Sequence, residues 1–279
     1  MSIVIKENCW QWDSPKGRFF MKYYEDIWLA QKVKYVHQQL ENIDFPYHVP
    51  LEHNEDRHIL KQKWIDGTSV NYEKRGHQIL ALQALETLHK STDKINWSQD
   101  VLPNYQLFQK WQRRFERFVA QEEALKGLLH NHYEVLVKEA FEALNAIEQS
   151  QQNFEPLTIL HGDVVHHNFM ISANDVKIID FDLATLGEAS DELILWMHRV
   201  LPQTKYNLAK LMKTHPYLQT AKHKLHYLNF PNEILRESLF YLKLNQRQKL
   251  SCYPFIQSIV RDWLKYKAPL KSTIQTMMK

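Results

Sequence analysis

The chain has 279 residues, of which 44% are hydrophobic and 12% aromatic, and its formal net charge is +3. This length and apolar content allow one large domain or two lobes around a cleft, as in an ordinary globular protein. No apolar run approaches the roughly 18 residues that would cross a bilayer, and the start MSIVIKENCW lacks the apolar stretch of a secretory signal. Cys9 and Cys252 give neither a disulfide framework nor zinc-ligand spacing. We therefore expect a cytoplasmic protein.

The charge is distributed unevenly along the chain. After residue 200 there are 14 Lys and Arg against 3 Asp and Glu, whereas the preceding residues contain 21 against 29. This basic C-terminal region could attract an anionic partner, such as an anionic substrate, polymer or surface. A solvated face that offsets the acidic remainder is the reading we favour. Apolar residues interrupt the cations at helical spacing, which argues against a nucleic-acid-binding tail.

The first part of the chain predicts a small antiparallel sheet and a helix. Strands are expected at residues 3–5, 9–12 and 18–24, because residues 13–17 (DSPKG) form a turn sequence between apolar runs. Side chains alternate along the last of these strands, so Phe20 and Lys22 share one face. Residues 26–41 have a mostly 3.6-residue apolar period, which predicts a helix. Further strands are expected at residues 47–51 and 57–65, with a boundary after them at Asp66-Gly67.

Most of the remaining chain has helical patterns. A core-facing helix is predicted at residues 73–90, and two long helical patterns fill residues 104–149. Asp191 precedes another apolar run and is expected to be the N-cap of a helix. The last predicted helices lie at residues 206–213, 232–249 and 254–267.

Residues 157–182 contain the most informative pattern in the sequence. An apolar run at 157–160 ends in His161-Gly162-Asp163, and Asn168 follows five residues after Asp163. Two β-prone runs then flank the turn sequence of residues 172–175 (SAND), which predicts a hairpin. If these four residues form the turn, Ile171 pairs with Val176, and Asn168 lies level with Ile179, beside Asp180.

This hairpin would gather the groups that metal-assisted phosphoryl transfer requires. Mg²⁺ prefers oxygen ligands, and Asn168 with Asp180 would supply them while leaving other positions to water and phosphate. Asp163 would remain free to receive the proton of an attacking hydroxyl. A transition-metal cluster is the competing interpretation, because His161, His166 and His167 lie near Asp163 in the sequence.

The order of Asp163, Asn168 and Asp180 resembles the catalytic loop and the metal-binding aspartate of kinases. Asp180-Phe181-Asp182 stands where a protein kinase has Asp-Phe-Gly. The segment is similar to the aminoglycoside phosphotransferase and choline kinase group of small-molecule kinases, and within that group to spore-coat CotS-type kinase-like proteins. The close match covers about residues 157–199, and weaker correspondence extends over most of the chain.

The resemblance implies a two-lobed α+β protein with a protein-kinase-like fold. A small antiparallel-sheet lobe would comprise residues 1–65 and bind the nucleotide, and a mostly helical lobe would comprise residues 66–279 and carry the catalytic loop and acceptor site. It further implies ATP and Mg²⁺ as cofactors, with Asp182 assisting a second metal ion. The nucleotide would be bound by the phosphate-binding lysine and the connector between lobes, that is, by Lys22, Gln62, Lys63 and Trp64.

Two departures from the kinase pattern concern nucleotide binding. Only Gly17 precedes Lys22, so the chain has no glycine-rich loop over the phosphates. Gln31 stands where the glutamate partner of the lysine is expected, and an amide cannot neutralise an ammonium group.

The expected function is ATP- and Mg-dependent phosphorylation of a hydroxyl on a small molecule, with Asp163 as the catalytic base. Trp111 and the arginines at positions 113, 114 and 117 could face the acceptor, although an exposed basic helix face explains them equally well. The alternative is a catalytically weak or inactive kinase-like scaffold or spore-coat protein. The residues do not identify the acceptor.

Overall fold

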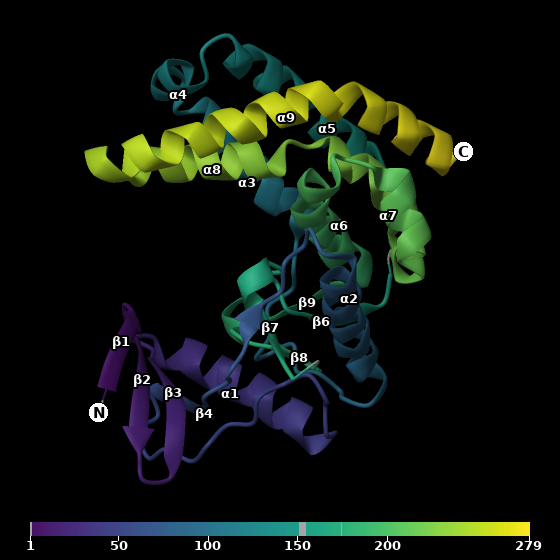
Figure 1. Cartoon of the computed structure of the whole chain (residues 1–279). Helices are drawn as coiled ribbons and strands as arrows, with labels where there is room; N and C mark the ends of the chain where they lie inside the picture. The colour runs from purple at the N-terminus through teal and green to yellow at the C-terminus, as the bar shows by residue number, and fades with distance from the viewer. Residues whose placement is uncertain (1, 151–154, 174) are drawn as a thin grey trace. The chain divides into compact units, whose positions relative to one another are not determined.

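A computed structural model describes residues 2–150, 155–173 and 175–279 (Figure 1). Contacts among these residues form two compact units, which we describe separately. The first unit contains the chain up to Tyr105 together with Pro156–Ala189, and the helical unit contains Gln106–Glu155 and Ser190–Lys279. A small antiparallel sheet with a mostly helical remainder confirms the predicted α+β fold class. The predicted lobes, 1–65 and 66–279, divide the chain differently and stay a prediction.

The N-terminal sheet of the first unit is antiparallel, in the order β1-β2-β3-β4. Its strands are β1 (Ser2–Lys6), β2 (Cys9–Ser14), β3 (Gly17–Tyr23) and β4 (Ile59–Lys63). In the register of β3 and β4, Phe20 lies opposite Gln62 and Lys22 lies opposite Leu60. Directly opposed residues of an antiparallel pair share a face, so these four side chains lie on one side of the sheet.

Helix α1 (Ile27–Asn42) lies between β3 and β4 in the chain, and the Asp26 side chain caps it by accepting a hydrogen bond from the backbone N–H of Trp28 at 2.8 Å. The strand predicted at residues 47–51 was wrong, since only Leu51 forms a bridge, with Gln62. Proline at positions 46 and 50 explains this difference, because proline has no N–H to donate to a ladder.

The predicted catalytic hairpin is present, and its register is the predicted one. Strand β7 (Phe169–Ser172) pairs antiparallel with β8 (Asp175–Ile178), with Ile171 opposite Val176. The backbone N–H of Ile179 donates to the carbonyl of Asn168 at 3.0 Å, so Asn168 and Asp180 lie at the same end of the hairpin. The predicted turn residue Asn174 lies outside the described residues.

The remaining elements of the first unit hold this hairpin. The short strand β5 (Thr68–Ser69) pairs with β7, and β6 (Leu157–Leu160) pairs with β9 (Thr185–Glu188), a strand that the sequence did not predict. A Cβ on Gly67 would lie 2.4 Å from the carbonyl oxygen of Ile171, so only glycine permits this approach. Helix α2 (Arg75–Lys90) packs against β6 and β8.

The helix boundaries of the helical unit differ from the predicted ones. Residues 104–149 contain three helices rather than two, namely α3 (Leu107–Val119), α4 (Glu122–Leu129) and most of α5 (His132–Ser150). Trp111 is fully buried and stacks on Phe230 with ring centroids 4.7 Å apart, so it belongs to the core. Asp191 is the third residue of α6 (Ala189–Val200) rather than its N-cap, and its carboxylate pairs with the Lys224 ammonium at 2.6 Å.

The last predicted helices have different bounds in the structure: the helix that begins at Asn232 is shorter than predicted, and the final helix is longer. After α7 (Leu208–Thr214) come α8 (Asn232–Lys243) and α9 (Gln246–Met278), and α9 continues through two prolines. Asn245 ends the predicted 232–249 helix early, because its side chain caps α9 together with Gln248. Among the described residues, no helix is both long and apolar enough to span a bilayer.

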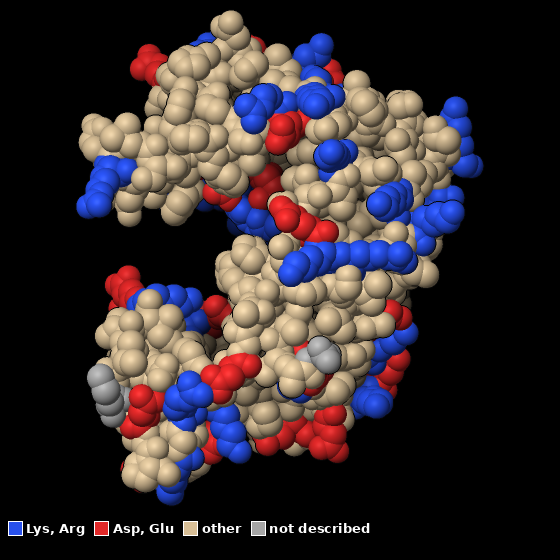
Figure 2. Space-filling view, viewed as in Figure 1, with Lys and Arg blue, Asp and Glu red and all other residues tan. Residues whose placement is uncertain are grey.

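Part of the C-terminal positive charge is neutralised within the helical unit. Lys267 binds the Glu139 carboxylate at 2.8 Å, and Lys271 binds its other oxygen. On the face drawn in Figure 2, lysines and arginines of this unit lie in separate groups rather than in one continuous patch. This arrangement agrees with a solvated face that offsets acidic groups.

Candidate functional site

The loop that carries Asp163 is braced by His161 and Gly162. The buried His161 ring lies with Nε2 2.9 Å from the carbonyl oxygen of Ile179, and its Nδ1 lies 3.3 Å from the backbone N–H of Asp163. These contacts suit a neutral imidazole that donates from Nε2 and accepts at Nδ1. Gly162 has φ +82°, and a Cβ there would lie 2.1 Å from the carbonyl oxygen of Leu183. The His-Gly pair therefore fixes the loop backbone and is structural.

Asn168 is connected directly to the Asp163 backbone. Its buried side-chain amide donates from Nδ2 to the Asp163 carbonyl at 3.0 Å. This bond orients the amide, and its oxygen accepts no hydrogen bond from the described residues. The half-buried Asp163 carboxylate forms no hydrogen bond or ion pair with the described residues, so it is available for chemistry.

Asp180 has a left-handed backbone, with φ 65° and ψ 64°. Few residues other than glycine adopt this conformation, although aspartate and asparagine tolerate it best. Such strain concentrates at functional sites. Here it lies at the end of the hairpin, where the chain turns into the short 3-10 segment Phe181–Leu183.

Lys22 binds both carboxylates of the Asp-Phe-Asp sequence. Its ammonium lies 2.8 Å from Asp180 and 2.6 Å from Asp182, and the Tyr24 hydroxyl donates to Asp182 at 2.7 Å. Burial on its own lowers the pKa of Lys22, but the two aspartates outweigh it and raise the pKa above its ordinary value. Burial raises the pKa of Asp180, whereas Lys22 and Lys6 lower it, and the net shift is downward. Both groups are therefore charged at neutral pH.

Helix α1 contributes a lysine rather than the glutamate that the kinase pattern predicts. Gln31 is exposed, so it is not the partner of Lys22. The next residue, Lys32, donates from Nζ to the backbone carbonyls of Asp182 at 2.7 Å and Ala184 at 3.2 Å. Successive helix residues point about 100° apart, which explains why a shift of one position changes the contact. Lys32 thus joins α1 to the segment that follows Asp180.

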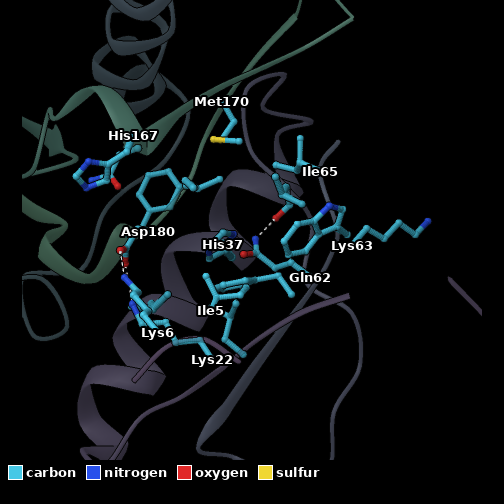
Figure 3. A pocket seen from close by; sticks show the side chains of 18 of the residues that line it. Ile5, Lys6, Lys22, His37, Gln62, Lys63, Ile65, His167, Met170 and Asp180 are labelled. Atoms are coloured by element: carbon cyan, nitrogen blue, oxygen red, sulfur yellow. Dashed lines mark hydrogen bonds and ion pairs between the residues drawn. The ribbon is translucent and has the colours of Figure 1, made fainter. Parts of the chain in front are cut away.

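A cavity of about 340 Å³ lies between the N-terminal sheet, α1 and the hairpin (Figure 3). Six of the predicted site residues line it, namely Lys22, Gln62, Lys63, Trp64, Asn168 and Asp180. The other two, Asp163 and Asp182, do not line it. Its size and mostly apolar walls with a few charged groups are typical of a small-molecule site.

The predicted connector residues contribute to this cavity in different ways. The buried Gln62 side chain donates to the Val49 carbonyl at 2.7 Å, so its amide holds the wall together. The Lys63 side chain extends away from the cavity in Figure 3 and lies 3.8 Å from Glu52. The Trp64 backbone N–H is already bonded to the Arg18 carbonyl at 2.9 Å.

Sequence reasoning missed several residues that line the cavity. Lys6 lies 3.9 Å from Asp180, and His37 lies beneath the cavity with its ring 5.2 Å from that of Phe181. Burial, with a smaller effect from His48, lowers the pKa of His37 to about 3, so this histidine is neutral. The helical period of α1 places position 37 one turn after the inward-facing Val33, and this was the signal that could have found it.

The residues predicted to bind a metal ion carry oxygen donors. Among the described residues, no group of three His, Cys, Asp or Glu side chains is placed to hold a metal ion. Asn168 and Asp180 both line the cavity, and their side chains carry an amide oxygen and a carboxylate. Two oxygen donors, with other positions left to water and phosphate, fit Mg²⁺.

Comparisons of folds find small-molecule kinases. An aminoglycoside phosphotransferase from Alicyclobacillus acidocaldarius has TM-score 0.73 and 16% identity, over 99% of this chain and 92% of that chain. A spectinomycin phosphotransferase in an AMP-bound complex has TM-score 0.63 and 14% identity, over 94% and 92%. A choline kinase from Streptococcus pneumoniae has TM-score 0.54 and 10% identity, over 99% and 91%. At these identities the likeness shows the fold.

Sequence comparison gives the family. A search among curated proteins found no match. The profile described as the phosphotransferase enzyme family matches residues 8–205, which is more than half of the chain. The chain therefore belongs to the phosphotransferase enzyme family.

Proposed function

We propose that this protein transfers the γ-phosphoryl group of ATP to a hydroxyl of a small molecule. The observation that carries this proposal is one cavity lined by Lys22, Asn168 and Asp180, with Asn168 hydrogen-bonded to the backbone of Asp163. The family supports phosphoryl transfer, and the AMP-bound spectinomycin phosphotransferase supports an adenine nucleotide.

The nucleotide would occupy the cavity with its phosphates toward Lys22. The Lys22 ammonium is matched by Asp180 and Asp182, so phosphate oxygens would share this cation. Asn168 and Asp180 would hold Mg²⁺, and Asp182 would assist a second ion. The metal would neutralise charge on the phosphate oxygens. Gln62 and Trp64 would shape the wall around the base.

Asp163 would act on the acceptor. Its carboxylate would accept the proton of the acceptor hydroxyl while that oxygen forms a bond to the γ-phosphorus. The bond from the γ-phosphorus to the bridging oxygen would break, and ADP would leave. In this class of reaction the protein contributes mainly positioning and charge stabilisation. Asn168 serves positioning here, because it fixes the backbone from which the Asp163 carboxylate extends.

The test substitutes Asp163 by asparagine. We expect Asp163→Asn to lower turnover by roughly 10²–10⁴, because the base is lost, and to leave nucleotide affinity nearly unchanged. Asp100→Asn is the matched control, since Asp100 is an exposed carboxylate of the same unit with no hydrogen bond or ion pair to the described residues. ADP release would be measured with Mg-ATP against a panel of amino alcohols, amino sugars and vitamin-like alcohols. Equal turnover of the Asp163→Asn and Asp100→Asn variants would remove Asp163 from the mechanism.

A non-catalytic scaffold is the alternative to this function, and thermal unfolding with Mg-ATP separates the two. A ligand at 100 times its Kd stabilises the folded state by ~2.7 kcal/mol. We expect Mg-ATP to raise the melting temperature of the wild type and to have a much smaller effect on Lys22→Met. The absence of any shift at millimolar Mg-ATP would favour the scaffold.

A further inference from the structure

Strand β1 contains one irregularity, and it decides where Lys6 points. Residues from Ser2 to Val4 pair with β2 in regular order, but the register then shifts, so that Lys6 lies opposite Cys9. Ile5 is the extra residue, as in a β-bulge, where two residues of one strand oppose one residue of the other. In an unshifted register Ile5 would lie opposite Cys9, and Lys6 would point to the other face. The bulge therefore turns Lys6 toward the side of the sheet that Cys9 faces.

This side of the sheet is the one that lines the cavity. Cys9 lies opposite Lys6 in one pair of strands and opposite Lys22 in the other. Directly opposed residues of antiparallel strands share a face, so the two lysines lie on the same side of the sheet, separated by one strand. Both line the cavity, and Figure 3 shows them close to Asp180, across the cavity from Ile65. The end of the cavity at Asp180 therefore contains two ammonium groups.

Each oxygen of the Asp180 carboxylate faces a different lysine. Lys22 binds Oδ1 at 2.8 Å, whereas the Lys6 Nζ lies 3.9 Å from Oδ2, which is too far for a hydrogen bond. The Lys6 side chain is 62% exposed and that of Lys22 only 13%. Lys6 forms no side-chain hydrogen bond with any residue that the structure describes. Turning toward another anion would therefore cost Lys6 no hydrogen bond.

We propose that Lys6 binds the β- and γ-phosphates of the nucleotide and takes the place of the missing glycine-rich loop. This inference rests on the proposed function, because it assigns a further residue to the same cavity. Metal ions in nucleotide-dependent phosphoryl transfer contact the β- and γ-phosphate oxygens. The Asp180 carboxylate, proposed above as a ligand of Mg²⁺, therefore marks the position of these two phosphates, and Lys6 lies beside it.

A lysine side chain and a glycine-rich loop act on phosphate in different ways. The loop brings backbone N–H groups to the phosphates, whereas the lysine supplies a full positive charge on a flexible stem. An exposed charge is screened by salt. Binding through Lys6 therefore depends on the number of phosphates in the nucleotide and on the ionic strength.

The test measures the affinity of Mg-ATP, Mg-ADP and AMP for the wild type, K6Q and K6R by isothermal titration calorimetry. We expect K6Q to weaken Mg-ATP binding by roughly tenfold or more, because a charge-assisted contact is lost. The loss is smaller for Mg-ADP and absent for AMP, which has only the α-phosphate. K6R keeps the charge and binds Mg-ATP nearly as the wild type does. An equal loss for ATP and AMP, or no loss for ATP, would overturn the proposal.

The control variant removes the same charge elsewhere on the same sheet. Lys16, in the turn between β2 and β3, is exposed, does not line the cavity and forms no side-chain hydrogen bond or ion pair with the described residues. We expect K16Q to bind all three nucleotides as the wild type does, and the gap between K6Q and K16Q to narrow as salt is added. A loss of Mg-ATP affinity in K16Q equal to that in K6Q would mean that overall charge, and not Lys6, attracts the phosphates.

Failure of this inference and failure of the proposed function give different results. If the wild type binds Mg-ATP and phosphorylates an acceptor while K6Q binds Mg-ATP equally well, only the role of Lys6 is lost. If K6Q weakens Mg-ATP binding as expected but no acceptor of the panel is phosphorylated, the role of Lys6 stands and the proposed transfer fails. If the wild type binds no nucleotide, both are wrong.

Discussion

At the scale of single residues, the candidate site combines backbone strain with buried charge. Asp180 pairs with Lys22 at 2.8 Å while its own backbone is left-handed. The two features have different chemical requirements, because the ion pair needs a carboxylate and the backbone needs a residue that tolerates positive φ. They can therefore be separated by substitution.

Asparagine and alanine at position 180 distinguish these requirements. Both substitutions remove the charge that pairs with Lys22, but asparagine tolerates the left-handed region and alanine does not. We expect Asp180→Ala to be less stable than Asp180→Asn by about 1 kcal/mol. Urea denaturation of the two variants measures this difference directly. Equal stability would show that the left-handed backbone at position 180 imposes no cost.

At the scale of elements, a half-buried side chain joins α1 to the segment after the hairpin. The Lys32 ammonium donates to two backbone carbonyls, those of Asp182 and Ala184. Burial lowers the pKa of Lys32, and Asp182 partly opposes this shift. The contact positions the backbone that carries the two aspartates, so Lys32 is a positioning residue for the proposed reaction.

Lys32→Met tests this contact against a neighbour on the same helix. The substitution keeps an apolar stem but leaves two carbonyls without their donor, which costs about 1–2 kcal/mol. Gln31→Met is the control, because Gln31 is exposed and surface substitutions usually change stability by less than ~0.5 kcal/mol. Unfolding free energies of both variants and of Lys32→Arg would be compared. A Lys32→Met variant as stable as Gln31→Met would contradict the bracing role.

Local chemistry explains which elements could be predicted. The hairpin register followed from its turn sequence, and the shared face of Phe20 and Lys22 followed from strand alternation. The contacts of Lys32 and the hydrogen bond from the Gln62 amide to the Val49 carbonyl could not be read in this way, because they depend on how elements pack in three dimensions. Helix α9 extends beyond the predicted bounds 254–267 and continues through Pro254 and Pro269, because a helix can continue through proline when its other contacts hold it.

At the scale of the whole molecule, both units contain a histidine that is buried in its neutral form. Burial lowers the pKa of His37 in the first unit and of His198 in the helical unit to about 3 each. His198 lies edge-on to Trp111 with ring centroids 5.5 Å apart, and its Nε2 has no hydrogen-bond partner among the described residues. Protonation would place a charged donor there without an acceptor.

These shifted values make stability depend on pH in a direction that can be derived. In the unfolded chain a histidine takes up its proton near pH 6.5, whereas His198 in the folded chain takes it up only near pH 3. The unfolded state therefore binds more protons between these values, and stability is lost as the pH falls below 6.5. Each such histidine contributes a slope of up to about 1.4 kcal/mol per pH unit between these two values.

The substitution His198→Asn removes the pH dependence of stability that His198 contributes. Its amide can still hydrogen-bond to the Tyr227 backbone, as His198 does. We expect the variant to be less stable than the wild type at pH 7, because a packed ring is lost, and to lose less stability between pH 6 and pH 4. The contribution of His37 remains in both proteins, so it cancels in the comparison. Urea denaturation at several pH values measures the difference between the two slopes. Parallel curves would show that His198 becomes protonated without unfolding, which requires water or an acceptor to reach Nε2.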